Sequence, residues 1–277
     1  MMRVAIIAAM AGELKPLVRG WQHESRSGAE IWRWQHDEGE WVAACAGAGV
    51  DAATRAFAEI EKDGAVSAVV STGWAGALRE ELAPGRAYWI SGVIDARTGE
   101  RFQTTDSDVP RSQNRDLGHP VLPDENGETQ SHPSRKNKNA ARVGHPDLWL
   151  VTSATVADEQ EKQRLAATYN AAMVDMEASG IARLAHMRGI PFYCSKGISD
   201  GFRDRLPDFN RFLTKNGEFM LVRFVLFVLL RPGYWPALIR MGENSKRAAR
   251  SIAESLLDLL DERGSIRKRN GYPNLRT

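Results

Sequence analysis

Short apolar runs alternate with amphipathic stretches along residues 1–205. The runs at 3–9, 66–71 and 191–198 are nearly continuous, which is typical of strands buried on both faces. Further strands are expected at 31–34, 41–46, 87–94, 148–152 and 172–175, and helices at 11–19, 51–62, 158–169 and 176–188. The alternation predicts an α/β fold with a central, mostly parallel or mixed twisted sheet flanked by helices.

Residues 103–146 break this alternation. The segment is rich in Asp, Arg, Asn, Ser, Pro and Gly and contains few apolar residues. Such a composition is typical of a long, mobile surface insertion. Its histidines, His119, His132 and His145, have no metal-ligand spacing, so we expect solvated loop histidines and no metal.

The C-terminal part contains the apolar run FMLVRFVLFVLL at residues 219–230. The run is too short to cross a bilayer, which takes about 20 residues. Two interpretations stay open: a helix docked on the core or at a dimer contact, or a helix lying in the plane of a membrane near Trp235. A final helix is expected at 235–263, with its apolar face formed by Ile252, Leu256, Leu259 and Leu260.

These patterns divide the chain into three parts. Residues 1–205 form the α/β domain, and residues 206–264 form helices that pack on this domain or on a membrane surface. Residues 265–277 form a basic tail, for which solvation is the simplest interpretation and contact with acidic lipid the alternative.

Composition narrows the partners and the compartment. The net charge of +2 over 277 residues gives no reason to expect a nucleic-acid partner. The two cysteines, Cys45 and Cys194, lie in apolar runs and are expected to be reduced core residues. The chain starts with an expected strand rather than a signal-peptide pattern. We therefore expect a cytoplasmic protein, with peripheral association at the inner membrane surface as the alternative.

Carboxylates follow several of the expected strands. Glu13, Glu177 and Asp200 each come shortly after a strand, and Gly73 follows another. Ligands of α/β folds gather beyond the carboxyl ends of strands. Cleavage of a ribosyl bond needs one group to hold the sugar and an acid to protonate the leaving base, with an oxocarbenium-like sugar between them. Two carboxylates at one sheet edge suit that reaction.

Four sequence blocks carry a family resemblance, namely VAIIAAMAGE at 4–13, STGWAGAL at 71–78, VDMEA at 174–178 and KGISD at 196–200. Together they resemble the purine nucleoside phosphorylase and nucleosidase superfamily, which includes methylthioadenosine/S-adenosylhomocysteine nucleosidases. The resemblance spans residues 3–102 and 148–201. It implies cleavage of the N-glycosidic bond of a purine nucleoside, adenine as the base, no metal or organic cofactor, and a homo-oligomer of two or more chains. The C-terminal part is similar to hopanoid-associated phosphorylases, whose substrate is an adenosyl lipid.

The resemblance also implies residue roles at the sugar and the base. Asp200 would donate a proton to N7 of the purine, with Ser199 positioning it. Glu177 would accept hydrogen bonds from the ribose hydroxyls, and Met176 would pack against the sugar face. Asp175 stands where Glu is usual, and its side chain is one methylene shorter. Each carboxylate also has a purely structural interpretation, as a helix cap or a first-turn residue.

The resemblance leaves the nucleophile open between water and phosphate. Glu13 falls where nucleosidases have the carboxylate that activates water, which favours hydrolysis. Trp74, after Gly73, replaces a common Ser and would form a pocket wall or stack on a ligand. Lys196 replaces a common Arg and could hold phosphate, which would then be a co-substrate, or could instead hold water or Glu13.

Base recognition would use backbone groups of the loop 154–158, centred on Val156, while Phe202 either stacks on the base or packs. Three hypotheses result. The first is a hydrolytic adenine nucleosidase, and the second is a phosphorylase of an adenosyl lipid. The third is a nucleoside-binding module without catalysis.

Overall fold

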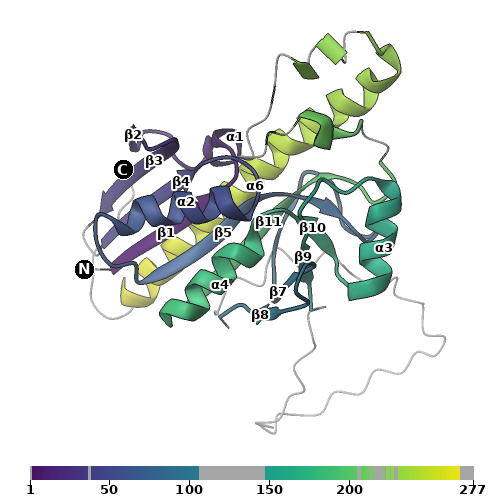
Figure 1. Cartoon of the computed structure of the whole chain (residues 1–277). Coiled ribbons are helices and arrows are strands. Elements are labelled where there is room, and N and C mark those ends of the chain that lie inside the picture. Colours follow the sequence, from purple (N-terminus) through teal and green to yellow (C-terminus); the bar gives the residue numbers. More distant parts are fainter. Residues whose placement is uncertain are drawn as a thin grey trace, which may run out of the picture.

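The computed structural model describes residues 2–36, 39–105, 147–204, 207–212, 214, 220, 223–224, 226–227 and 230–268, with side chains to 258. Eleven strands form one mixed sheet with helices on both faces (Figure 1), which confirms the predicted α/β class. The predicted insertion lies outside the described residues from 106 to 146, together with its three histidines. Residues 269–277, which contain most of the predicted basic tail, also lie outside them.

The middle of the sheet is parallel and buried. Strand β1 (Met2–Ala8) pairs in parallel with β4 (Gly39–Cys45) and β5 (Ala68–Ala77), and β5 pairs in parallel with β11 (Phe192–Asp200). Every residue of β4 and β11 is buried. Continuous apolar runs produce such strands because helices cover both faces, as the sequence predicted for β1 and β11.

The rest of the sheet extends to either side of this centre. On one side β4 pairs with β3 (Ala29–His36), and β3 pairs with the polar edge strand β2 (Gln22–Arg26). On the other side lie the short strands β10 (Met173–Asp175), β9 (Trp149–Thr152), β7 (Gly92–Asp95) and β8 (Arg101–Gln103), while β6 (Ala87–Trp89) pairs with β11. The single strand expected at 87–94 is therefore two strands, β6 and β7.

Strand β5 is longer than predicted. The expected strand ended at residue 71, but β5 continues through Gly73 and Trp74 to Ala77. Gly73 has φ of 119°, a conformation that residues with a Cβ avoid. This glycine lets β5 bend and remain paired with β11 on one side, while its last residues pair with β10. Gly73 and Trp74 are thus strand residues and do not follow the strand.

Helices α2 (Val50–Glu61) and α4 (Ala178–Arg188) cover one face, and α6 (Trp235–Lys268) crosses the opposite face (Figure 1). A Cβ on Gly180 would lie 2.5 Å from Val50 Cγ1, so this glycine allows α2 and α4 to pack closely. Ile252 and Leu256 of α6 are buried against the sheet, as the apolar pattern predicted. The last expected helix is thus observed, and its backbone extends to Lys268.

Helix α1 (Ala11–Leu14) is shorter than the helix expected at 11–19. Pro16 has no N–H to continue the helical hydrogen bonds, although Lys15 before it still has helical φ and ψ, and turns occupy most of the chain up to β2. Strand β2 was not predicted because its sequence, QHESR, has no apolar alternation. Its side chains are mostly exposed, as an edge strand allows.

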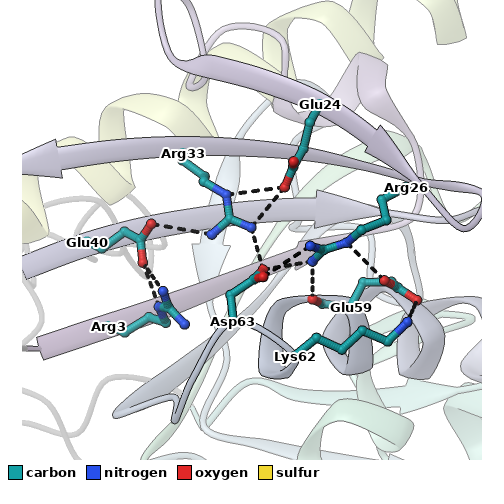
Figure 2. A network of polar contacts seen from close by, with 8 residues as sticks. All are labelled: Arg3, Glu24, Arg26, Arg33, Glu40, Glu59, Lys62 and Asp63. Atoms are coloured by element: carbon teal, nitrogen blue, oxygen red, sulfur yellow. Dashed lines mark hydrogen bonds and ion pairs between the residues drawn. The ribbon is translucent and has the colours of Figure 1, made fainter.

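An ion-pair network attaches the edge hairpin to the body of the domain (Figure 2). Arg33 on β3 bonds both Glu24 of β2 and Asp63, and Arg26 bonds Asp63 and Glu59. The guanidiniums of Arg26 and Arg33 hold the pKa of Asp63 well below its usual range. The network therefore ties β2 and β3 to the C-terminal end of α2.

Candidate active site

The predicted carboxylates gather at the carboxyl ends of neighbouring strands. Glu13 follows β1, Asp175 ends β10, and Asp200 ends β11. Glu177 directly precedes α4, and all four side chains are buried. The sheet therefore brings together residues that are far apart in the sequence, as the expected strand ends predicted.

Three backbone N–H groups hold the Glu13 carboxylate in place. One oxygen accepts bonds from Ala9 and Met10, both at 2.8 Å, and the other accepts one from Trp74 at 2.7 Å. Burial raises the pKa of the Glu13 carboxyl, and these bonds and the charge of Lys196 offset only part of the rise. A raised pKa brings a carboxylate closer to the working range of a general base.

Gly73 makes room for this carboxylate. A Cβ at residue 73 would lie 2.7 Å from Oε1 of Glu13, which is closer than van der Waals contact allows. The positive φ and the close approach together require glycine here. Gly73 therefore lies against the Glu13 carboxylate, and its lack of a side chain leaves room for that group.

Lys196 and Asp175 form a fully buried ion pair. Nζ of Lys196 lies 2.8 Å from Oδ2 of Asp175 and donates to the carbonyl of Thr72 at 2.9 Å. Burial acts to lower the pKa of Lys196, but attraction to Asp175, Cys194 and Glu177 and the hydrogen bond to Asp175 together outweigh it, so the pKa is raised. Asp175 also accepts bonds from the Thr152 hydroxyl at 2.7 Å and the Ala178 N–H at 3.0 Å. Both charges are therefore committed to partners within the protein.

Glu177 lies next to this pair. Its Oε1 accepts the Gly49 N–H at 2.8 Å, which joins the start of α2 to the start of α4. Burial, followed by repulsion from Asp175, raises the pKa of Glu177 to about 7, although Lys196 acts against the rise. Met176, the residue before it, is partly exposed. Glu177 is thus a carboxylate whose charge changes close to neutral pH.

This raised pKa predicts a pH-dependent stability. Between pH 4.5, its ordinary pKa, and about pH 7, folded Glu177 keeps a proton that the unfolded chain has released. The free energy of unfolding contributed by Glu177 therefore falls as pH rises through this window. Glu177→Gln cannot lose the proton, so urea unfolding should show the variant gaining stability relative to wild type from below pH 4.5 to above pH 7. A difference in unfolding free energy between variant and wild type that is equal at all pH values would contradict this prediction. The control is Glu243→Gln, at an exposed glutamate.

Asp200 has two side-chain partners. The Ser199 hydroxyl donates to Oδ1 at 2.6 Å, and the Lys162 ammonium contacts Oδ2. Lys162 lies on α3 (Glu159–Tyr169), is buried, and also donates to the carbonyl of Gly201 at 2.7 Å. The contact with Ser199 was expected from the sequence, whereas Lys162 was not. The one sequence feature that could have indicated the burial of Lys162 is its position three residues before Leu165, which places both on the same helix face.

The expected base-recognition loop is held by a residue that the sequence did not single out. The carboxamide of Asn210 accepts the Val156 N–H at 2.8 Å and donates to the Val156 carbonyl at 3.0 Å. Phe202, after the end of β11, is partly exposed. The N–H and the carbonyl of Val156 therefore both bond the side-chain amide of Asn210. A ligand with one acceptor and one donor side by side could bond the same two groups.

Trp74 joins β5 to the C-terminal helix. Its indole N–H donates to the carbonyl of Ser245 on α6 at 2.9 Å, and its ring lies 3.4 Å from the position that a Cβ on Gly12 would take. Trp74 thus forms a wall between α1 and α6 and supplies no hydroxyl. A separate hollow of about 410 Å³ lies between β8 and α4 and contains none of these site residues.

Comparisons with solved structures agree with the fold. None of the curated protein sequences is significantly similar to this chain. Among solved structures, the 5′-methylthioadenosine/S-adenosylhomocysteine nucleosidase of Helicobacter pylori has a TM-score of 0.63 at 15% identity, covering 95% of this chain and 99% of its own. The futalosine hydrolase of the same species has a TM-score of 0.62 at 14% identity, covering 94% and 98%. The Arabidopsis thaliana 5′-methylthioadenosine nucleosidase has a TM-score of 0.65 at 12% identity, covering 94% and 95%.

The sequence itself places the chain in a family. Residues 3–222 match the sequence model of the Phosphorylase superfamily, which is most of the 277-residue chain. This match agrees with the resemblance in the four sequence blocks and with the fold of the nucleosidase structures. The chain therefore belongs to the Phosphorylase superfamily, as an enzyme of the nucleosidase and nucleoside phosphorylase kind.

Proposed function

We propose that the protein hydrolyses the N-glycosidic bond of an adenine nucleoside. The observation that carries the choice of water over phosphate is the Lys196–Asp175 ion pair. A phosphate site at this position would need the lysine charge, but Asp175 already neutralises it at 2.8 Å. Glu13 and Glu177 add acidic groups to the same region, and whichever of them is ionised would repel a phosphate dianion.

The buried carboxylates fit the charge that develops during hydrolysis. As the bond from C1′ to the base breaks, the sugar gains positive charge, which neighbouring carboxylates stabilise. Glu177 would accept hydrogen bonds from the ribose hydroxyls. Glu13, fixed by three N–H groups, would take a proton from the attacking water.

The leaving base needs a proton to depart as a neutral molecule. Asp200 would deliver it to N7, and Lys162, in contact with the Asp200 carboxylate, would resupply it from its ammonium group. Lys162 would then recover a proton from the solvent, and Glu13 would release to the solvent the proton that it took from the attacking water, so that the proton balance closes over one turnover. Ser199 would keep the Asp200 carboxylate oriented through its 2.6 Å hydrogen bond.

Adenine as the base is supported by the Asn210 contact. The amide of Asn210 presents one acceptor and one donor to Val156, and adenine presents the same pair through N1 and its amino group. Adenine would therefore replace Asn210 on the Val156 backbone. Asn210→Ala removes this competitor, so calorimetry should show tighter binding of adenine by several-fold, with Arg211→Ala, at an exposed side chain of the same turn, as the control. Weaker binding by Asn210→Ala would mean that the amide only supports the loop.

The proposed hydrolysis is tested by measuring adenine release from methylthioadenosine and from adenosine, with and without phosphate. Release without phosphate is the expected result, and Glu13→Gln should reduce it by at least about 10²-fold if Glu13 is the general base. Release that strictly requires phosphate would overturn hydrolysis. Tight binding of adenine without release from either nucleoside would instead indicate a module that has lost catalysis.

Phosphorolysis of an adenosyl lipid is the second candidate. It is favoured by the apolar surface that the protein exposes before α6, for example at Leu226. A substrate with a lipid at its 5′ position would account for that exposure. Adenine release from adenosylhopane that depends on phosphate, with no release from methylthioadenosine, would establish this candidate.

A further inference from the structure

The residues before and at the start of α6 expose an unusual number of large apolar side chains. Leu226 is 58% exposed, Leu230 82%, Trp235 43% and Ile239 62%. They account for four of the eight large apolar side chains that are exposed in the described part of the chain. In Figure 1 this yellow-green segment projects beyond the sheet and its covering helices.

The segment nevertheless has a core of its own. The ring of Phe224 lies 5.3 Å from that of Phe209 and 5.4 Å from that of Phe212, and Phe227 lies 5.1 Å from Phe212. Tyr234 continues the stack at 6.2 Å from Phe227. These five rings therefore pack against one another, whereas the four exposed residues named above remain on the surface.

The charged residues within 219–242 are all positive, and the next acidic residue along α6 is Glu243. Residues 219–242 contain Arg223, Arg231 and Arg240 and no Asp or Glu. All three arginines are exposed, and the guanidinium of Arg231 lies over the Phe227 ring at 4.0 Å. Arginines that border an apolar surface can keep their charge at the level of lipid headgroups while their stems lie against apolar groups. The charge is complementary to a surface of anionic lipid.

We propose that this C-terminal apolar surface, formed by Leu226, Leu230, Trp235 and Ile239 and bordered by Arg223, Arg231 and Arg240, docks on an anionic phospholipid membrane. No helix within the described ranges is long and apolar enough to cross a bilayer. The contact is therefore peripheral: the aliphatic side chains enter the interface, and the arginines pair with headgroup phosphates. This inference does not depend on which nucleophile the enzyme uses.

The test is sedimentation of the full-length protein with vesicles of phosphatidylcholine alone and of phosphatidylcholine mixed with phosphatidylserine. We expect binding to the mixed vesicles that weakens as salt concentration rises, and much weaker binding to phosphatidylcholine. Leu230→Ser with Ile239→Ser should reduce binding at least about tenfold, because two exposed aliphatic side chains no longer enter the interface. The matched control is Met187→Ser, at a side chain that is 73% exposed on α4.

Three results would overturn the proposal. One is the absence of binding to the mixed vesicles, and another is equal binding by the double-serine variant and the wild type. The third is a wild-type protein that is dimeric and does not bind vesicles, together with a double-serine variant that is monomeric. The surface would then contact a second copy of the chain. Adenine release from soluble nucleosides should be the same in the variant and the wild type, because Leu230 and Ile239 lie on the projecting segment.

Discussion

Replacement of Asp200 by Asn is expected to slow adenine release by about 10²- to 10⁴-fold, the range typical for loss of a general acid. Asn keeps the shape of the side chain and can still accept the Ser199 hydroxyl. It cannot pass a proton to N7, and it leaves the Lys162 ammonium buried beside a neutral amide. The measurement is kcat for methylthioadenosine, followed through adenine release.

A second variant separates lost chemistry from lost stability. Asp200→Asn leaves an unpaired buried charge at Lys162, whereas the double variant with Lys162→Met removes that charge. The double variant should therefore be more stable than Asp200→Asn in thermal unfolding and should remain as slow in catalysis. If Asp200→Asn retains wild-type kcat, Asp200 is a structural residue and the proposed acid is wrong.

Much of the fold could be predicted because the central strands are buried on both faces. β1 and β11 appear in the sequence as nearly continuous apolar runs, and α4 and α6 have apolar residues at helical spacing. β5 was truncated in the prediction because Gly73 looks like a chain break in sequence. In the structure its positive φ bends the strand and lets pairing continue. One glycine can end a strand or bend it, and only the neighbouring strands decide which.

The positions of Glu13, Glu177 and Asp200 followed from the strand ends, but their partners did not. Lys162 lies on the polar helix α3, where a lysine is usually solvated, and its burial depends on the distant end of β11. Asn210 lies beyond the strands altogether, and its contact with Val156 is visible only in three dimensions. Residue types and element ends can be predicted locally, whereas the partner of a buried charge depends on tertiary packing.

Lys196 illustrates this difference most clearly. From the sequence it was a candidate phosphate ligand, as a lysine in place of an arginine. In the structure its ammonium lies 2.8 Å from Asp175, and both side chains are fully buried. Its charge also lowers the pKa of Glu13 and of Glu177, each of which burial raises. Lys196 therefore acts as the internal counter-ion of a group of three carboxylates.

Lys196→Met is consequently expected to lower the free energy of unfolding by about 3–5 kcal/mol, the range for removing one partner of a buried ion pair. Methionine fills similar volume but leaves Asp175 without its cation. Urea unfolding at neutral pH measures the loss, and Lys196→Met with Asp175→Asn should recover part of it because residue 175 no longer carries an unpaired charge. A loss below about 1 kcal/mol would match an exposed ion pair and contradict the counter-ion role.

The same variants separate the two candidate reactions. If Lys196 only balances the carboxylates, the double variant should still release adenine without phosphate, and phosphate should not change its rate. If Lys196 instead holds phosphate, wild-type turnover should depend on phosphate, and the double variant should lose that dependence together with its activity. The double variant is expected to be more stable than Lys196→Met alone. The comparison of its rates with and without phosphate therefore reports on the nucleophile and not on unfolding.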